Sequence, residues 1–322
     1  MKPAYFANTK TFAYNFIKHG VPLKFKNLYV MMKSFSFFPG SKGIFLLLPV
    51  LSGLVFSCNH KQEEIRVMTF NIRLDTPADS MNSWKYRREN AARMIRFYDV
   101  DLLGTQEVLH NQLQDLLNLL PEYGYIGAGR KDGKTEGEYS ALFFRKCRFD
   151  LLKTGNFWLS QTPEVPGSMG WDAACERMVT WGIFKDRANG KKFAAFNTHF
   201  DHMGKVARLN SALLLKDRIS QIAGNMPVIL TGDFNDTEGS EPIQKLLEGG
   251  KLKDTRRSAA LVYGPEWTFH GFGQVPLPER ERIDFIFVSP SAEVNACASL
   301  AEVCDTLYLS DHNPVLAKVV LP

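Results

Sequence analysis

The 322-residue chain is 45% hydrophobic and 23% charged, a composition that suits a globular protein with a sizeable core and excludes a disordered or collagen-like one. Its formal net charge of +5 is unevenly distributed. Residues 1–58 contain seven lysines and no acidic residue, which leaves 32 basic and 34 acidic side chains in residues 59–322. That body carries a charge of about −2, so it lacks the uniformly basic surface that would by itself recruit nucleic acid.

Residues 32–58 have the pattern of a secretory signal. Lys33 and Lys42 form a positive flank before the apolar run 44–56, which is too short for a membrane-spanning helix of about 20 residues. The stretch 54–58 resembles a bacterial lipobox, so we expect Cys58 to be lipidated and residues 32–58 to be a lipoprotein signal peptide. The alternative is a buried hydrophobic hairpin with an ordinary core cysteine.

The rest of the chain consists of an upstream segment, residues 1–31, and a body, residues 59–322. Residues 1–31 show no export pattern, and we expect them to be an upstream extension before a start at Met31 or Met32. Residues 59–322 contain no low-complexity linker or repeat, so they are expected to form a single domain. The four remaining cysteines have no zinc-ligand spacing, and buried free thiols are the default expectation.

Strand and helix signals alternate along residues 59–322. The expected elements, in chain order, are strand 65–71, helix 87–98, strand 102–106, helix 108–120, strands 139–145, 178–185 and 193–197, helix 206–223, strand 228–231, helix 241–247, and strands 283–288 and 315–320. A loop containing proline and glycine is expected at 160–172. This mixed alternation favours two packed sheets covered by helices.

Polar residues recur where the expected strands begin or end. The six blocks are 68–71, 106–107, 197–202, 231–235, 282–284 and 310–314. Taken alone, Asp233 or Asp311 could be a turn or cap residue, and a single histidine is more often structural than catalytic. Together, however, oxygen donors with two histidines and no thiolate cluster are the groups that a hard divalent cation and phosphate chemistry require.

These six blocks, in this order, resemble the endonuclease/exonuclease/phosphatase superfamily over residues 64–321. The segments 156–172 and 177–181 further resemble an uncharacterised bacterial branch of it. The resemblance implies an α/β fold, a four-layer α/β/β/α sandwich of two packed mixed sheets flanked by helices, with the site at one end of the sheets. The substrate is not implied by the fold.

The resemblance also implies roles for individual residues. The metal ligands would be Glu107, Asp311 and Asn71, and the metal would be Mg²⁺ or Mn²⁺. The catalytic residues would be Asp233, Asn235, Asp284, His312 and His199.

Elementary chemistry agrees with these roles. Phosphoester hydrolysis needs an in-line water and neutralisation of charge on the phosphoryl oxygens. Asp233 could take the proton of the water, and His312 could donate a proton to a phosphoryl oxygen. Asp284 beside His312 would raise the proton affinity of the imidazole, which suits a donor near neutral pH.

Three residues are candidate substrate contacts. Arg177 could clamp a phosphate or pair with a carboxylate, and His202 faces the site only if its turn folds back. His270 lies in a Thr-Phe-His-Gly segment that resembles a family loop near the site. Glu138 could pair with His199 or be a surface charge at a strand start.

Four further residues have ordinary structural interpretations. Trp84 is expected to pack at a helix start, and Arg87 is expected to be solvated. Trp158 and Trp171 flank the 160–172 loop, where they could line a pocket or act as packing anchors.

The sequence therefore predicts a metal-dependent phosphoesterase, a monomer held by a lipid anchor at Cys58 on the bacterial cell envelope, in the periplasm or on the outer-membrane surface. Its substrate would be a phosphodiester or phosphomonoester of undetermined class. One alternative is a nuclease acting on DNA or RNA, which the bulk charge does not support. The other is a catalytically silent envelope binding lipoprotein.

Overall fold

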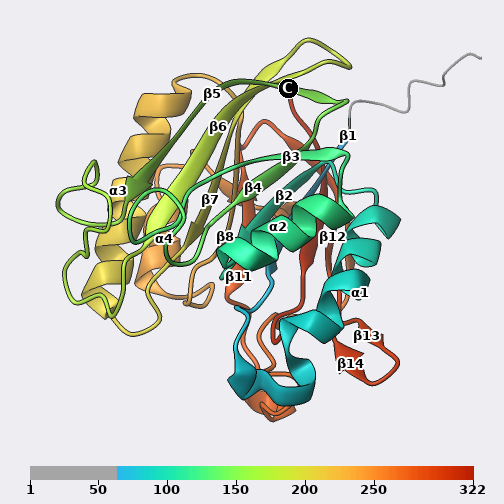
Figure 1. Ribbon diagram of the computed structural model, residues 1–322. Helices are drawn as coiled ribbons and strands as arrows, with labels where there is room; N and C mark the ends of the chain where they lie inside the picture. Colours follow the sequence, from blue (N-terminus) through green and yellow to red (C-terminus); the bar gives the residue numbers. More distant parts are fainter. Residues whose placement is uncertain (1–63) are drawn as a thin grey trace, which may run out of the picture. The chain divides into compact units, whose positions relative to one another are not determined.

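The computed structural model describes residues 64–322, which contain two β-sheets packed face to face with helices on both outer faces (Figure 1). The predicted upstream extension 1–31, the predicted signal peptide 32–58 and the lipidation site Cys58 lie outside the described residues. Within residues 64–322, no helix is long and apolar enough to cross a membrane.

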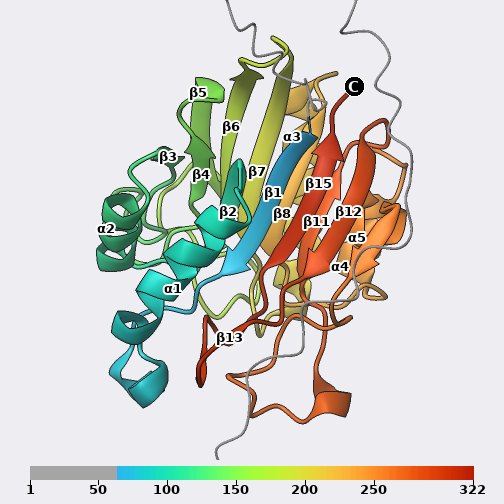
Figure 2. The same ribbon diagram turned by 90° about the vertical axis from the view of Figure 1, so that its right-hand side faces the viewer.

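The first sheet has seven strands. Its spatial order is β10 (Leu261–Tyr263), β12 (Glu293–Ser299), β15 (Val315–Val320), β1 (Glu64–Asn71), β2 (Leu102–Gln106), β4 (Leu142–Arg145) and β3 (Tyr123–Ile126). Strand β1 runs parallel to β2 and antiparallel to β15, as the opposed arrows in Figure 2 show. The sheet is therefore mixed.

The second sheet has six strands and is also mixed. Its order is β5 (Phe149–Trp158), β6 (Met178–Asp186), β7 (Lys192–His199), β8 (Val228–Asp233), β11 (Asp284–Val288) and β9 (Lys253–Asp254). Strands β7 and β8 are parallel, and β11 is antiparallel to β8. A separate two-stranded sheet pairs β13 (Val303–Cys304) with β14 (Leu307–Tyr308).

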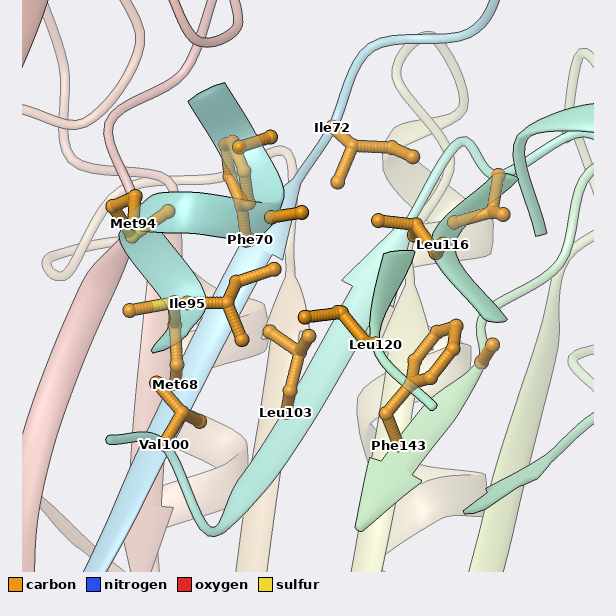
Figure 3. Close-up of a cluster of buried hydrophobic side chains, with 14 of the residues drawn as sticks. Met68, Phe70, Ile72, Met94, Ile95, Val100, Leu103, Leu116, Leu120 and Phe143 are labelled. Carbon is orange, nitrogen blue, oxygen red and sulfur yellow. The ribbon is translucent and has the colours of Figure 1, made fainter. Parts of the chain in front are cut away.

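Three apolar layers hold these elements together. Between the sheets, side chains such as Val67, Phe184 and Ile286 are almost completely buried. On the outer face of the first sheet, Ile95 and Leu116 lie in one buried cluster with Phe70 (Figure 3). On the outer face of the second sheet, Phe196 and Leu215 belong to the third cluster. Burial of this apolar surface at about 25 cal/mol per Å² is the main favourable term in the stability of such a sandwich.

The outer layers are helical. Helices α1 (Trp84–Phe97) and α2 (His110–Leu119) cover the first sheet, and α3 (Lys205–Ala223) and α4 (Glu241–Leu247) cover the second. The short elements are α5 (Thr255–Ser258) and the 3₁₀ turns Pro77–Asn82 and Leu277–Glu279. The four-layer α/β/β/α sandwich predicted from the sequence is confirmed.

Two local expectations are corrected. The first helix begins at Trp84 rather than at residue 87, and Arg87 is buried instead of solvated. Its guanidinium donates to the carbonyls of Ile72 and Leu309 at 2.7 and 2.8 Å, which ties α1 to the segments after β1 and before β15. Burial lowers the pKa of Arg87 to about 10, so the side chain still carries a positive charge at neutral pH.

The described cysteines are free thiols, as expected, but they are not all buried. Cys297 is buried, Cys147 is exposed, and Cys175 and Cys304 lie between these extremes.

Candidate active site

The topology of the first sheet brings one half of the predicted site together. Asn71 is the last residue of β1, and Glu107 directly follows β2, which runs parallel to β1. Strand β15 runs the other way, so Asp311 and His312, which precede it, lie at the same edge. The four side chains meet because of strand direction, although they are up to 241 residues apart in the chain.

The second sheet supplies the other half from a single row of strand ends. His199 ends β7 and pairs in register with Asp233, which ends β8. Asp284 begins the antiparallel β11 directly opposite Asp233. Because the two sheets pack face to face, this row lies against the polar edge of the first sheet.

Asn71 joins the two halves. Its Nδ2 donates to Glu107 Oε1 at 3.1 Å and to Asp233 Oδ2 at 2.9 Å. The same nitrogen lies 3.5 Å from His312 Nε2. Since Asn71 is fully buried, these hydrogen bonds fix the distance between Glu107, a carboxylate of the first sheet, and Asp233, a carboxylate of the second.

His312 is held between two carboxylates. Its Nδ1 donates to Asp284 Oδ2 at 2.8 Å, and its Nε2 lies 3.8 Å from Asp233 Oδ2. Burial by itself would lower the pKa of His312, but the carboxylates of Asp284 and Asp233 outweigh that effect and hold the pKa well above 6.5. The ring is therefore a protonated donor at neutral pH.

The pKa of Asp233 is also raised, but here burial causes the shift instead of opposing it. Burial and the neighbouring Asp284 charge raise its pKa from 3.8 to about 7, although His312 and Asn71 act against the shift. A carboxylate with a pKa near the working pH is well suited to accept a proton. Glu107 behaves differently: burial would raise its pKa, but the His312 charge and the Asn71 hydrogen bond lower it, so Glu107 is ionised.

Asn235 and His199 complete the second-sheet half. The Asn235 backbone N–H donates to Asp233 Oδ1 at 2.9 Å, and its side-chain Nδ2 lies 2.9 Å from His199 Nε2. His199 Nε2 is also 3.5 Å from Asp233 Oδ2. Burial, followed by the charges of two arginines, lowers the pKa of His199 well below 6.5, so its imidazole is neutral.

Three site residues adopt the left-handed backbone conformation, which costs a non-glycine residue roughly 1 kcal/mol. They are Arg73 (φ 57°), Glu107 (φ 61°) and Asn235 (φ 47°). In each case the turn follows a strand end and directs a polar side chain towards the site. Such strain is concentrated at functional sites, where the surrounding fold holds it in place.

A buried polar network supports the floor of the site. Asn197 Oδ1 accepts from Gln106 Nε2 at 2.7 Å and from Thr231 Oγ1 at 2.9 Å, and its Nδ2 donates to the Thr105 carbonyl. A side chain at Gly104 would clash with Asn197 and Thr231. The network thus ties the two sheets together just beneath the catalytic residues.

The carboxylates of Glu107 and Asp311 form the candidate divalent-metal site. Both face the guanidinium of Arg73, whose Nη1 is 3.8 Å from Glu107 Oε2 and whose Nε is 3.8 Å from Asp311 Oδ2. Burial raises the pKa of Asp311, and its closeness to Glu107 contributes. Two crowded carboxylates fit a hard cation such as Mg²⁺ or Mn²⁺. The predicted third ligand, Asn71, turns its Nδ2 to Glu107, and its Oδ1 accepts from the Arg73 backbone N–H at 3.0 Å.

A second acidic group lies deeper. One ligand atom from each of Asp233, Asp284 and His312 lies within 4.8 Å of the others. Here, however, the protonated imidazole already supplies the positive charge between the two carboxylates. The group is therefore better described as an acid–base triad than as the principal metal site.

The predicted substrate contacts lie in two places. Arg177, directly before β6, is buried beside β7, with its Nη2 3.1 Å from His202 Nδ1 and its Nε 3.6 Å from Asp201 Oδ2. His270 is buried in its own loop, where its Nδ1 accepts from the Gly273 N–H. Burial lowers the pKa of His270 to about 4.

Glu138 takes neither of the two roles that the sequence left open, a pair with His199 or a surface charge. It accepts from Arg130 Nη1 at 2.7 Å, and both side chains are largely buried. Trp158 is also buried, and its Nε1 donates to the Arg130 carbonyl at 2.6 Å. Trp158 is therefore a packing anchor that holds the Arg130 loop, and Trp171 is half-buried.

The sequence interpretation missed three residues of the site. Arg73 contacts both candidate metal carboxylates. Thr268 Oγ1 accepts from the backbone N–H groups of Ile283 and Asp284 at 3.1 Å each, which places the start of β11. Ser310 Oγ donates to the Asn71 carbonyl at 2.7 Å. Each had a sequence signal: Arg73 follows the polar block 68–71 by two residues, Ser310 opens the block 310–314, and Thr268 opens the Thr-Phe-His-Gly segment.

This arrangement of strand-end acids, amides and histidines agrees with the comparison to known families. Residues 68–312 match the endonuclease/exonuclease/phosphatase family. The chain belongs to this family. Its members are hydrolases that act on phosphoesters.

Two solved structures are similar over 80% of the chain. An endonuclease/exonuclease/phosphatase from Bacteroides vulgatus is 49% identical, with a TM-score of 0.79 and 99% of its own chain covered. A mannosyl-6-phosphatase from Bacteroides thetaiotaomicron is 38% identical, with a TM-score of 0.74 and 100% of its chain covered.

A curated relative is more distant. The uncharacterized protein R895 of Acanthamoeba polyphaga mimivirus is 25% identical over 258 residues, which are 67% of this chain. The match spans only 37% of that viral protein.

Proposed function

We propose that the protein is a divalent-metal-dependent phosphatase that hydrolyses a phosphomonoester of a sugar at the bacterial cell envelope. The observation that carries the proposal is the triad in which His312 lies between Asp284 and Asp233. It places a protonated donor beside a carboxylate whose pKa is about 7. The 38% identity to a mannosyl-6-phosphatase supports a sugar phosphate as the substrate class.

In this proposal the protein residues divide the work. Asp233 accepts a proton from the attacking water, because its pKa lies close to neutral pH. His312 donates to a phosphoryl oxygen through Nε2, while Asp284 fixes its ring through Nδ1. Asn235 orients Asp233 through its backbone N–H and holds His199 through its side chain.

Glu107, Asp311 and Asn71 would hold the metal ion. The carboxylate oxygens of Glu107 and Asp311 match the preference of Mg²⁺, and of Mn²⁺, for hard ligands. Asn71 positions Glu107 through its Nδ2. When bound, the ion would supply positive charge that neutralises the phosphoryl oxygens.

Charge distribution favours a small substrate over a nucleic acid. The body has a formal charge of about −2, and most arginines outside the site are paired with carboxylates, such as Arg148 with Asp186 and Arg257 with Glu238. Arginines neutralised in this way do not form the phosphate-binding track that a nuclease uses.

The place of action follows from residues 32–58. Their signal-like pattern and Cys58 support a lipid-anchored monomer on the envelope, in the periplasm or at the outer-membrane surface. Replacement of Cys58 by alanine should move the protein from the membrane fraction to the soluble fraction. Unchanged membrane retention of Cys58→Ala would contradict lipidation at that residue.

The activity is tested with the purified protein on mannose 6-phosphate, glucose 6-phosphate, bis-p-nitrophenyl phosphate, DNA and RNA. We expect release of inorganic phosphate from the sugar phosphates with Mg²⁺ or Mn²⁺, and none in EDTA. Glu107→Gln should lose activity, while Asp150→Asn, an exposed acid at the far end of β5, serves as the matched control. Activity only on DNA or RNA would support the nuclease alternative, and activity in EDTA would contradict metal dependence.

A further inference from the structure

A second polar region lies beside the proposed catalytic centre. It consists of Arg177 before β6, Arg130 in the loop after β3, and His199 at the end of β7; we call it the arginine flank. Arg177 and His199 are 5% and 6% exposed. The positive charges of both arginines act on His199 and on Glu138, so the groups lie within electrostatic range of one another.

Arg177 has buried donors that no group in residues 64–322 satisfies. Among these residues, its Nε and Nη1 have no hydrogen-bond partner. The nearest carboxylate, Asp201, is 3.6 Å from Nε, which is too far for a hydrogen bond. The Asp201 oxygens are already occupied by the backbone N–H groups of Ala174, Met203 and Gly204.

The other two members of the flank also present unsatisfied donors. Arg130 pairs with Glu138 through Nη1, but in the described part of the chain its Nε has no partner. The Asn235 amide nitrogen can only donate, so His199 Nε2 is the acceptor of their 2.9 Å contact. The ring proton of the neutral imidazole is therefore on Nδ1, which is buried and unpartnered.

All four unsatisfied atoms are donors, and two of the three side chains are guanidinium groups. Leaving such donors buried and unpaired is unfavourable, so the flank is suited to a ligand that provides several acceptor oxygens. Guanidinium groups bind carboxylate and phosphate through paired hydrogen bonds. The complementary ligand is therefore an anion.

The sheet separates this anion from the phosphate that is cleaved. Neighbouring strands lie about 4.8 Å apart, so β6 is about 10 Å from β8, where Asp233 lies. His199 bridges the interval, with Nε2 turned to Asn235 and Asp233 and with Nδ1 free on the ring's other side. This spacing is comparable to the distance between two anionic groups attached at opposite ends of a six-carbon sugar.

We propose that the arginine flank is a second anion subsite, which selects substrates carrying a carboxylate or a second phosphate about one sugar ring from the scissile phosphate. This inference rests on the proposed phosphatase function and narrows its substrate class. The Arg130 loop is held in place for this role by the Trp158 hydrogen bond to the Arg130 carbonyl.

The test compares glucose 6-phosphate with 6-phosphogluconate and fructose 1,6-bisphosphate. We expect the wild-type kcat/KM to be at least tenfold higher for 6-phosphogluconate or for fructose 1,6-bisphosphate than for glucose 6-phosphate. Arg177→Met should reduce this ratio of kcat/KM values at least tenfold. Arg187→Met is the matched control: Arg187 follows the opposite end of β6 and is exposed, so the ratio should stay the same. Arg130→Met with Glu138→Gln, which leaves no unpaired carboxylate, should act like Arg177→Met.

Two results would overturn the subsite. The first is an equal fall of kcat/KM for all three probes in Arg177→Met, which would assign Arg177 to the scissile phosphate. The second is a wild-type enzyme that does not prefer either probe with a second anion.

Failure of the subsite and failure of the proposed phosphatase function are distinguished by calorimetry. This measures the binding of the three probes to Asp233→Asn and does not require turnover. Tighter binding of 6-phosphogluconate or fructose 1,6-bisphosphate than of glucose 6-phosphate, lost in Asp233→Asn/Arg177→Met, would support the subsite even in an enzyme with no phosphatase activity. Equal binding of the three probes would contradict it. Circular dichroism of every variant identifies any that fails to fold, and the Arg130 double variant then carries the test.

Discussion

The two ends of the paired sheets use the same residue types in opposite ways. At the end away from the site, Asp101 contacts Arg66 at 3.0 Å and Arg148 at 2.8 Å, and Asp186 contacts Arg148 at 3.0 Å. At the site end, Asp233 and Asp284 are just as buried, yet within residues 64–322 no arginine contacts either of them. Their charge is met by His312, by the Asn71 amide and by the backbone N–H of Asn235.

This difference separates stability from reactivity. Carboxylates paired with arginine at the far end hold the strands together, because removing one partner would leave buried charge uncompensated. At the site end, Asp233 binds its proton more tightly than an ordinary carboxylate, as its pKa of about 7 indicates. The site end therefore gives up stability for groups that exchange protons near neutral pH.

The largest expected effect comes from the site end. Asp233→Asn and His312→Gln should each reduce kcat at least 10³-fold, because they remove the proton acceptor or the donor. Asp233→Asn should leave the free energy of unfolding unchanged or raise it, since it removes a buried negative charge beside Asp284. Phosphate release and urea unfolding measure the two effects, and a loss of activity below tenfold would exclude Asp233 from proton transfer.

At the end of the sheets away from the site, we expect a substitution to lower stability and to leave activity almost unchanged. Asp101→Asn should lower the free energy of unfolding by about 2 kcal/mol, because Arg66 and Arg148 lose the buried carboxylate that they share, while Arg66 keeps Asp99 and Arg148 keeps Asp186. kcat should stay within twofold of wild type when measured well below the melting temperature. A stable Asp101→Asn protein with low activity would break the comparison between the two ends.

The pH profile sharpens the comparison. Asp233 must be ionised to accept a proton, so kcat/KM should rise about tenfold per pH unit up to about pH 7 and then level off. The plateau should persist until His312, whose pKa lies well above 6.5, loses its proton. Flat activity from pH 5 to 7 would show that Asp233 is not the group that titrates.

The ionisation of Asp233 should lower the stability of the fold over the same pH range in which it raises kcat/KM. The folded pKa of Asp233 is above its ordinary value of 3.8, so the folded chain binds the proton more tightly than the unfolded chain does. The contribution of this proton is complete below about pH 4 and is lost as pH rises through about 7. Urea unfolding of Asp233→Asn over this range should lack that loss of stability.

The smallest expected effect is indirect. Thr268→Val removes the hydroxyl that accepts from the N–H groups of Ile283 and Asp284, and it should lower the free energy of unfolding by about 1 kcal/mol. kcat should fall about fivefold because Asp284 no longer fixes His312 as firmly. Thr268→Ser, which keeps the hydroxyl, is the control, and equal activity of the Ser and Val variants would contradict this positioning role.

The sequence predicted the strands that have clear apolar patterns, but it missed others. Strand β5 was not predicted because its middle is exposed and a bulge lies between Leu151 and Lys153. Strand β12 was missed because its sequence is mainly small and polar residues. Both are recognised only through their partners β6 and β15, since strand pairing is decided by tertiary contacts.

The sequence by itself determined which residue types stand at the strand ends, because short polar blocks after apolar runs are local patterns. It could not determine that Arg73 faces both Glu107 and Asp311, that Glu138 pairs with Arg130 instead of His199, or that Arg177 keeps buried donors unsatisfied.

Those facts depend on distances between groups that lie far apart in the chain. Burial and neighbouring charge, which set the pKa of Asp233 and of His312, exist only after the two sheets have packed. The local pattern therefore specified the chemical groups, and the tertiary structure decided their protonation and their partners.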